Sequence, residues 1–166
     1  MSRDADGRPM KNAETAGVIA RPPVLFLVAL LCGLALDWLF PLSHPVPQAA
    51  VGYWIGAGSL AFLGLALAAA GIRDFARAET PVPTNEPTRW LVTTGMHGWT
   101  RNPIYLGMFL LYGGIGLVAR SPWALLLTAP LALAIRYGVV AREEAYLERR
   151  FGGAYRDYKS RVRRWL

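Results

Sequence analysis

The chain has 166 residues, of which 54% are hydrophobic and 17% charged, with a formal net charge of +7. That length suits one domain of ordinary size. Four long apolar segments in so short a chain leave nothing to cover them in water, which excludes an ordinary soluble protein. The basic residues lie within reach of a membrane surface, so their charge indicates anionic lipid headgroups rather than nucleic acid as the partner.

The apolar segments predict an all-α, polytopic membrane protein with four transmembrane helices. Each segment has roughly the 17–25 residues that a spanning helix needs. The N-terminal residues 1–20 are polar and aperiodic, and we expect them to form a mobile cytoplasmic tail ahead of a single membrane domain, 21–166. The predicted spans are residues 24–40, 49–72, 103–119 and 122–140.

The Lys and Arg residues alternate along the connections. The N-terminal tail, the loop between the second and third spans and the C-terminal tail are rich in them. The first loop, 41–48, has none and the third has only Arg120. Cytoplasmic loops carry the excess of Lys and Arg, so both termini and the middle loop are predicted to be cytoplasmic. We expect the membrane to be the inner membrane of a bacterium.

The second span contains Gly52 and Gly56, a small-xxx-small step that favours close helix packing. A proline-rich stretch, 80–87, follows and cannot be helical. Pro103 suits the first turn of the third span, with Asn102 before it as the expected N-cap. The helix dipole and free N–H groups at this end favour an anion beside Arg101.

The fourth span continues without a breaker into a charged helix that ends near Gly152. Glu143 and Glu144 stand at its membrane boundary, and they either hold a ligand's cation or are solvated charges paired with Arg residues. A short helix follows. Its aromatic face, with Tyr155 and Tyr158, either lies on the membrane or folds over a site.

The two polar clusters end at one membrane face, which predicts a pocket for a zwitterionic, amino-acid-like cofactor. We expect no metal there, because His97 is the only histidine nearby and no spaced acidic partner accompanies it.

The segment Thr100–Gly107 resembles the Arg-His-Pro-x-Tyr-x-Gly motif of the isoprenylcysteine carboxyl methyltransferases and related phospholipid methyltransferases, which are integral membrane proteins. The resemblance covers residues 95–166, and Gly95 and the downstream polar cluster fall where that family carries them. It implies a helical membrane bundle with a cytoplasmic S-adenosylmethionine site built from 95–107 and 141–166. Asn102 stands where the family usually has His, and Gly98 where Arg is common.

The resemblance also implies roles for individual residues. It makes Arg101, Asn102 and Glu144 catalytic candidates. The implied cofactor-binding residues are Arg101, Asn102, Tyr105, Leu106, Gly107, Glu143, Glu144, Tyr155, Tyr158 and Arg161.

The methyl acceptor is expected to be a membrane-resident, lipophilic molecule. An asparagine cannot act as a base, so Asn102 favours an acceptor that needs none, most like the carboxyl of a prenylcysteine. N-methylation of a phospholipid headgroup, S-methylation of a small thiol and a non-catalytic assembly or transport role stay open. Arg136, one turn inside the fourth span, either holds a substrate carboxylate or snorkels to the interface. Trp99 is a second candidate for substrate contact.

Overall fold

The computed structural model describes residues 16–43, 50–82 and 86–166. Within these residues all regular structure is helical, which confirms the all-α class. The greater part of the expected N-terminal tail, most of loop 41–48 and the middle of the proline-rich stretch lie outside the described residues.

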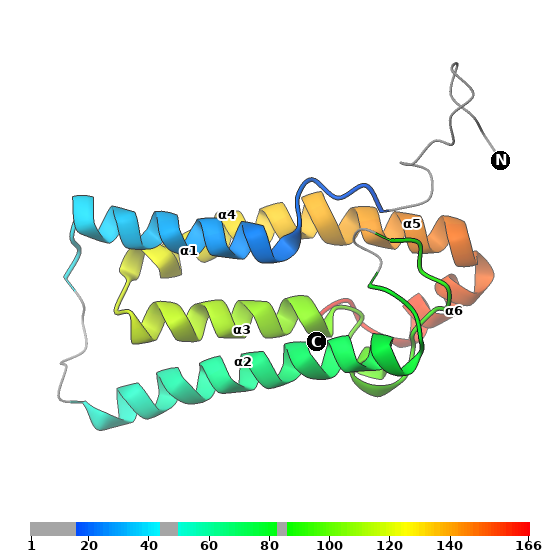
Figure 1. Ribbon diagram of the computed structural model, residues 1–166, viewed down its shortest axis with the longest axis horizontal. Helices are drawn as coiled ribbons and strands as arrows, with labels where there is room; N and C mark the ends of the chain where they lie inside the picture. The colour runs from blue at the N-terminus through cyan, green and yellow to red at the C-terminus, as the bar shows by residue number, and fades with distance from the viewer. Residues whose placement is uncertain (1–15, 44–49, 83–85) are drawn as a thin grey trace, which may run out of the picture.

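The long helices lie side by side in two layers (Figure 1). One layer holds α1 (Pro22–Leu39) and α4 (Pro122–Ile135), and the other holds α2 (Val51–Arg77) and α3 (Pro103–Val118). A single 3-10 turn, η2 (Gly95–Gly98), precedes α3. A π-helical turn, η3 (Arg136–Val140), continues α4 into α5 (Ala141–Phe151), and α6 (Gly153–Arg161) follows.

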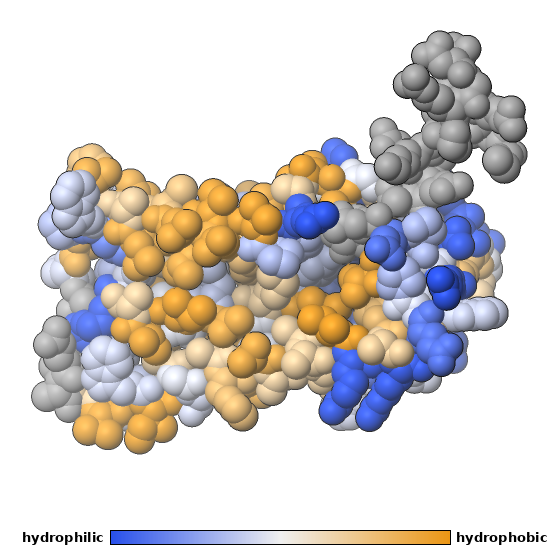
Figure 2. Space-filling model, in the orientation of Figure 1, coloured by the Kyte–Doolittle hydropathy of each residue, from blue (hydrophilic) through white to orange (hydrophobic). Residues whose placement is uncertain are grey.

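Among the described residues, three helices are long and apolar enough to cross a membrane: α1, α2 and the continuous helix Pro122–Phe151. The remaining apolar helix, α3, has 16 residues and falls short of that length, so its crossing stays a prediction. Large apolar side chains face outward along the helices, as Phe62 does with 74% of its surface exposed. In Figure 2 apolar side chains cover much of the visible face, while hydrophilic ones gather toward the end with α5 and α6.

The closest helix contact joins α2 and α3 through glycines. A Cβ atom placed on Gly107 would lie 2.5 Å from the backbone nitrogen of Ala68 and 2.6 Å from the carbonyl oxygen of Gly64. No side chain fits there, so the two backbones pack directly on each other. The expected step at Gly52 and Gly56 is not this contact, because a Cβ at either position would meet no described atom within 4 Å.

The end of the bundle opposite α5 is tied by polar side chains. Ser121 caps α4, since its Oγ accepts a hydrogen bond of 3.0 Å from the backbone N–H of Ala124. The same hydroxyl donates to the carboxylate of Asp37, the acidic residue near the end of α1. The indole of Trp123 donates to the carbonyl of Phe40 at 2.8 Å. These bonds satisfy some of the polar groups at the two helix ends and join the ends to each other.

At the other end, the segment before α1 packs on the junction of α4 and α5. The carbonyl of Gly138, in the π-helical turn, accepts a hydrogen bond of 3.2 Å from the N–H of Ile19. Arg142 donates to the carbonyl of Gly17 at 2.7 Å. The last residues of the expected tail are therefore docked beside α5, at the end where α2 finishes and α3 begins.

Candidate functional site

A pocket lies where the end of α2, the turn η2 and the start of α3 meet α5 and α6. It brings together most of the residues that the sequence predicted for the cofactor: Arg101, Asn102, Tyr105, Glu143, Glu144, Tyr155 and Tyr158. Its wall also contains side chains that the sequence analysis did not assign to a cofactor, among them Phe75, Thr88, Val92, His97 and Leu147.

Glu144 is the centre of a charged cluster in this pocket. The guanidinium of Arg101 donates to Oε1 at 2.9 Å. Arg164 donates to both oxygens, with 2.9 Å from Nε to Oε1 and 2.6 Å from NH2 to Oε2. A two-pronged arginine–carboxylate contact is a strong charge-assisted interaction. Glu144 is therefore neither a solvated charge nor free for a ligand, and a ligand's cation would have to share it with Arg164 or displace Arg164.

The side chain of Asn102 binds the C-terminal backbone and does not accept a cap hydrogen bond from α3. Its Nδ2 donates to the carbonyl of Arg164 at 2.9 Å, and the hydroxyl of Thr100 donates to the same oxygen at 3.1 Å. The backbone N–H of Arg101 donates to the carbonyl of Arg163 at 2.9 Å. Asn102 occupies the expected N-cap position, and its backbone carbonyl accepts from the N–H of Leu106 at 3.0 Å. Its side chain does not cap the helix, because it is turned toward the C-terminal backbone.

Glu143 points into the pocket from the neighbouring position on α5. The hydroxyl of Tyr105 donates to its Oε1 at 2.7 Å, and both residues are buried. This bond joins the first turn of α3 to α5. Both glutamates therefore line the pocket, although successive helix positions point about 100° apart.

The aromatic face of α6 covers the pocket, in agreement with one of the two alternatives left open by the sequence. Tyr155 and Tyr158 are buried, and the hydroxyl of Tyr158 donates to the carbonyl of His97 at 2.6 Å. Burial raises the pKa of both phenols, so they remain neutral hydrogen-bonding groups at physiological pH.

The other residues named from the sequence do not line this pocket. Gly107 packs against α2, Leu106 is half-buried elsewhere, and Arg161 is exposed, with its Nε bonded to the carbonyl of Asp157. Trp99 is 83% exposed. The guanidinium of Arg136 lies 5.2 Å from the ring centre of the exposed Tyr137. Contacts of these residues with a cofactor or substrate stay predictions.

Two buried polar atoms in the pocket wall have no hydrogen-bond partner among the described residues: Oγ1 of Thr88 and Nε of Arg101. Such groups are costly unless a ligand or water completes them. The sequence gives no signal that Thr88 belongs to the pocket, because a tertiary contact positions it. Its backbone N–H donates to the hydroxyl of Tyr146 at 3.1 Å. The cavity measures about 60 Å³, which is room for a few water molecules.

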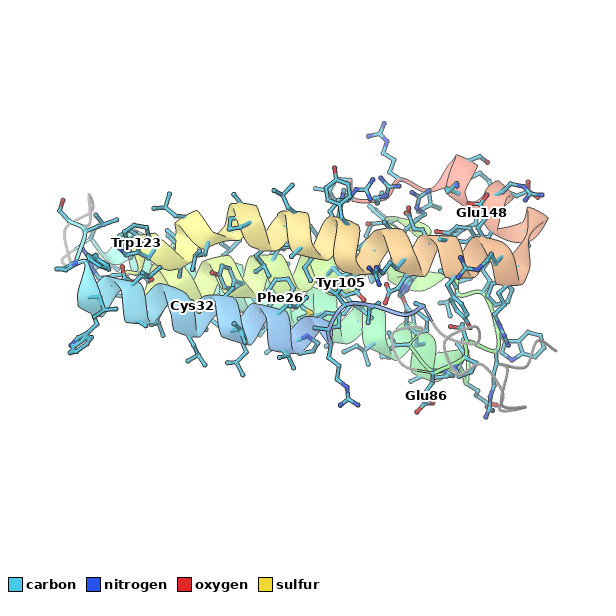
Figure 3. The ribbon with its side chains drawn as sticks, turned by 90° about the horizontal axis from the view of Figure 1, so that it is seen from above. Phe26, Cys32, Glu86, Tyr105, Trp123 and Glu148 are labelled. Atoms are coloured by element: carbon cyan, nitrogen blue, oxygen red, sulfur yellow. The ribbon has the colours of Figure 1, made fainter. Side chains whose placement is uncertain are left out.

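A larger apolar groove adjoins the pocket. It has a volume of about 570 Å³ and runs between the start of α1, the end of α2 and the start of α3. Val82, Ile104 and Tyr105 line both hollows. Figure 3 shows Tyr105 among the helices, short of the end marked by Glu86 and Glu148. The charged residues of the groove are Arg21 and Glu86. The described residues contain no group of three His, Cys, Asp or Glu side chains placed to hold a metal ion.

Comparison with known proteins places the chain in a family. The model of a family described as phospholipid methyltransferase matches residues 51–154, more than half of the chain. That segment includes α2 to α5 and, with them, Arg101 and Glu144. An uncharacterised protein of Haemophilus influenzae is 59% identical over 34 residues, which are 20% of this chain and 54% of the relative. The match thus spans about half the length of that relative. No solved structure matches the chain.

Proposed function

The chain belongs to the phospholipid methyltransferase family, integral membrane methyltransferases that include the isoprenylcysteine carboxyl methyltransferases, and we propose that it transfers a methyl group from S-adenosylmethionine to a lipophilic acceptor. The observation that carries this proposal is that a pocket with buried charged side chains in its wall joins an apolar groove at Tyr105. One hollow suits a water-soluble cofactor, and the other suits the apolar part of an acceptor.

The residues of the pocket fit the cofactor chemically. Bound there, S-adenosylmethionine would supply an electrophilic methyl group on a sulfonium. Glu144 offers a carboxylate for an ammonium group, and Arg101 has an unused Nε–H for a carboxylate. Thr88 offers an unpaired hydroxyl, and the apolar side chain of Leu147 suits the face of a base. Methyl transfer needs alignment more than acid–base groups, and these fixed side chains supply it.

The pocket must widen to admit such a ligand. Pockets for drug-sized molecules enclose about 300–1,000 Å³, far more than the cavity seen here. We infer that the C-terminal segment 162–166 moves, because the guanidinium of Arg164 occupies the Glu144 carboxylate that a ligand's cation would need. This movement would break the hydrogen bonds that Asn102 and Thr100 donate to the Arg164 carbonyl. We infer that cofactor binding displaces Arg164 from Glu144 while Arg101 stays in place.

The described basic residues support an arrangement in the membrane. Arg21 before α1, Arg101 before α3 and Arg142 on α5 lie at the end of the bundle that holds the pocket. We infer that α1, α2, α3 and the helix from Pro122 each cross the membrane, with both termini cytoplasmic, in a bacterial inner membrane. Residues 21–166 then form one membrane domain whose C-terminal extension carries half of the cofactor site.

Binding of S-adenosylhomocysteine to the full-length protein in detergent or nanodiscs tests the cofactor. A ligand at one hundred times its dissociation constant stabilises the fold by about 2.7 kcal/mol, which thermal unfolding detects. Thr88→Val and Thr128→Val form a matched pair, since only Thr88 lines the pocket. We expect only the first to weaken binding. Folded protein that shows no shift at millimolar ligand would contradict the proposal.

A further inference from the structure

We propose that His97 is a catalytic base that removes a proton from the methyl acceptor and that Asp74 is its positioning residue, which makes the acceptor a lipophilic amine. This inference rests on the proposed function and names the acceptor chemistry of the same site. It replaces the base that Asn102 cannot supply, and it disfavours the carboxyl acceptor expected from the sequence, because a carboxylate needs no base.

The first observation is a buried carboxylate–imidazole pair at the pocket wall. Oδ2 of Asp74 lies 3.2 Å from Nδ1 of His97, and both residues are buried. The same oxygen accepts a hydrogen bond of 2.7 Å from the N–H of Met96. A Cβ atom placed on Gly95, whose φ is +63°, would overlap this carboxylate, so no larger residue fits at that position.

The second observation concerns the orientation of the ring. An imidazole that donates its Nδ1–H to Asp74 keeps the lone pair on Nε2. None of the described residues forms a hydrogen bond with Nε2. The ring of Phe75 packs edge-to-face on the imidazole, with 4.8 Å between centres, and the hydroxyl of Tyr158 holds the His97 carbonyl. Asp74 and Phe75 thus restrain the ring, Tyr158 restrains its backbone, and His97 lines the pocket.

The third observation concerns where Asp74 and His97 lie relative to the apolar groove. Asp74 follows Gly71 by one turn of α2, so the two lie on the same face. A Cβ placed on Gly71 would lie 3.2 Å from the backbone nitrogen of Ile104. Ile104 lines both the groove and the pocket. An acceptor that passes Ile104 from the groove thus enters the pocket that His97 lines.

The protonation state of the ring suits a base. Burial lowers the pKa of His97, and the hydrogen bond and charge of Asp74 raise it only in part, so the imidazole is neutral near pH 7. The ionisable groups that share the pocket are Arg101 at the start of α3, Glu143 and Glu144 on α5, and Tyr155 and Tyr158 on α6.

The proton and electron balance of the step is simple. A primary ammonium on the acceptor gives one proton to Nε2 of His97 and becomes a neutral amine. Its lone pair forms a bond to the sulfonium methyl carbon while the methyl–sulfur bond breaks and leaves its electron pair on sulfur. The imidazolium then returns its proton to water, and the product leaves as a secondary ammonium.

One test follows the ring itself, without turnover. The chain has two histidines, so a His44→Gln background leaves only His97 for imidazole ¹⁵N NMR. We expect a neutral ring near pH 7, with the proton on Nδ1, and modification of Nε2 by diethylpyrocarbonate. A ring that is charged at neutral pH, carries its proton on Nε2 or resists the reagent would overturn the proposal.

A second test compares two acceptors of equal chain length, a long-chain primary amine and a long-chain carboxylic acid, in the same nanodiscs. General bases typically contribute about 10²–10⁴-fold, so His97→Gln should lower kcat for the amine at least about 100-fold. Affinity for S-adenosylhomocysteine should change by less than about threefold, because the base is not needed for binding. The control His44→Gln should match the parent protein.

The positioning role of Asp74 has its own readout. Asp74 raises the pKa of His97, so Asp74→Asn should move the acid limb of the kcat profile for the amine to lower pH. A merely structural role would lower the rate without moving that limb. The proposal would be overturned if the protein methylated only the carboxylic acid. It would also be overturned if His97→Gln lowered kcat equally for the amine and the carboxylic acid. Failure to bind S-adenosylhomocysteine would instead contradict the proposed function. The NMR measurement needs no cofactor, so it tests the His97 proposal separately.

Discussion

Arg101 and Glu144 are 43 residues apart in the sequence, yet 2.9 Å separates NH2 of one from Oε1 of the other, and both side chains are largely buried. The contact joins the start of α3 to α5, so it closes the apolar hairpin between them. Arg164 completes the cluster from the C-terminal segment. The strongest electrostatic feature of the site is thus also the contact that a cofactor must rearrange.

Replacement of Glu144 by Gln should weaken both the fold and cofactor binding. It leaves Arg101 and Arg164 without their carboxylate, and loss of a hydrogen bond to a charged group costs about 1.5–3 kcal/mol. Affinity for S-adenosylhomocysteine should fall roughly tenfold or more. The matched control is Glu148→Gln, which removes the exposed pair with Lys159 and should change neither quantity measurably. Equal effects in the two variants would contradict the assignment of Glu144 to the pocket.

Two buried tyrosines of α3 offer a second comparison. Tyr105 donates to Glu143 at 2.7 Å beside the pocket, and Tyr112 donates to the carbonyl of Ala124 at the same distance, away from it. Each Tyr→Phe variant should lose about 1–3 kcal/mol of unfolding free energy. Only Tyr105→Phe should also weaken binding of S-adenosylhomocysteine, as measured by calorimetry. Weakened binding in Tyr112→Phe would point to a general loss of structure instead.

The glycine contact between α2 and α3 predicts a large effect from one methyl group. Gly107→Ala would force the two backbones apart, and overpacking of this kind costs about 1–3 kcal/mol. Gly56→Ala meets open space and should be neutral or slightly stabilising, because alanine favours helix. Thermal unfolding in one detergent measures both variants. A similar melting temperature for the two would mean that the helices do not approach as closely as described.

Protonation of His97 should make stability depend on pH. Because burial lowers its pKa in the folded state, the unfolded chain binds more protons between that pKa and the ordinary value of about 6.5. The unfolding free energy contributed by this group is therefore complete above about pH 6.5 and falls as the pH drops below it. His97→Gln should flatten this fall between about pH 7.5 and about pH 5.5. An unchanged profile would place the titration elsewhere.

The pocket should face the cytoplasm. Reporter fusions at the N-terminus and after Leu166 should both register cytoplasm, whereas a reporter inserted in loop 41–48, which has no Lys or Arg, should register the outside. If the C-terminal reporter registered the outside, the pocket would lie on the external face of the membrane, away from cytoplasmic S-adenosylmethionine, and the proposed topology would be wrong.

The sequence by itself determined the helical class, the position of the apolar segments and the grouping of two polar clusters at one end. These features are local: apolar length, proline at helix starts and the distribution of Arg can be read without knowing which helices touch. The uninterrupted helix through Arg136 to Phe151 and the short helix after Gly152 also follow from local signals.

Only the tertiary structure decided how the polar groups pair. The side chain of Asn102, expected to cap α3, instead donates a hydrogen bond to the carbonyl of Arg164. Sequence spacing cannot reveal that the C-terminal segment returns to this position. Thr88 entered the pocket through a contact with Tyr146, and His97 acquired Asp74 across 23 residues. Such partners depend on which faces of the helices meet, and in this chain glycines at the α2–α3 crossing set those faces.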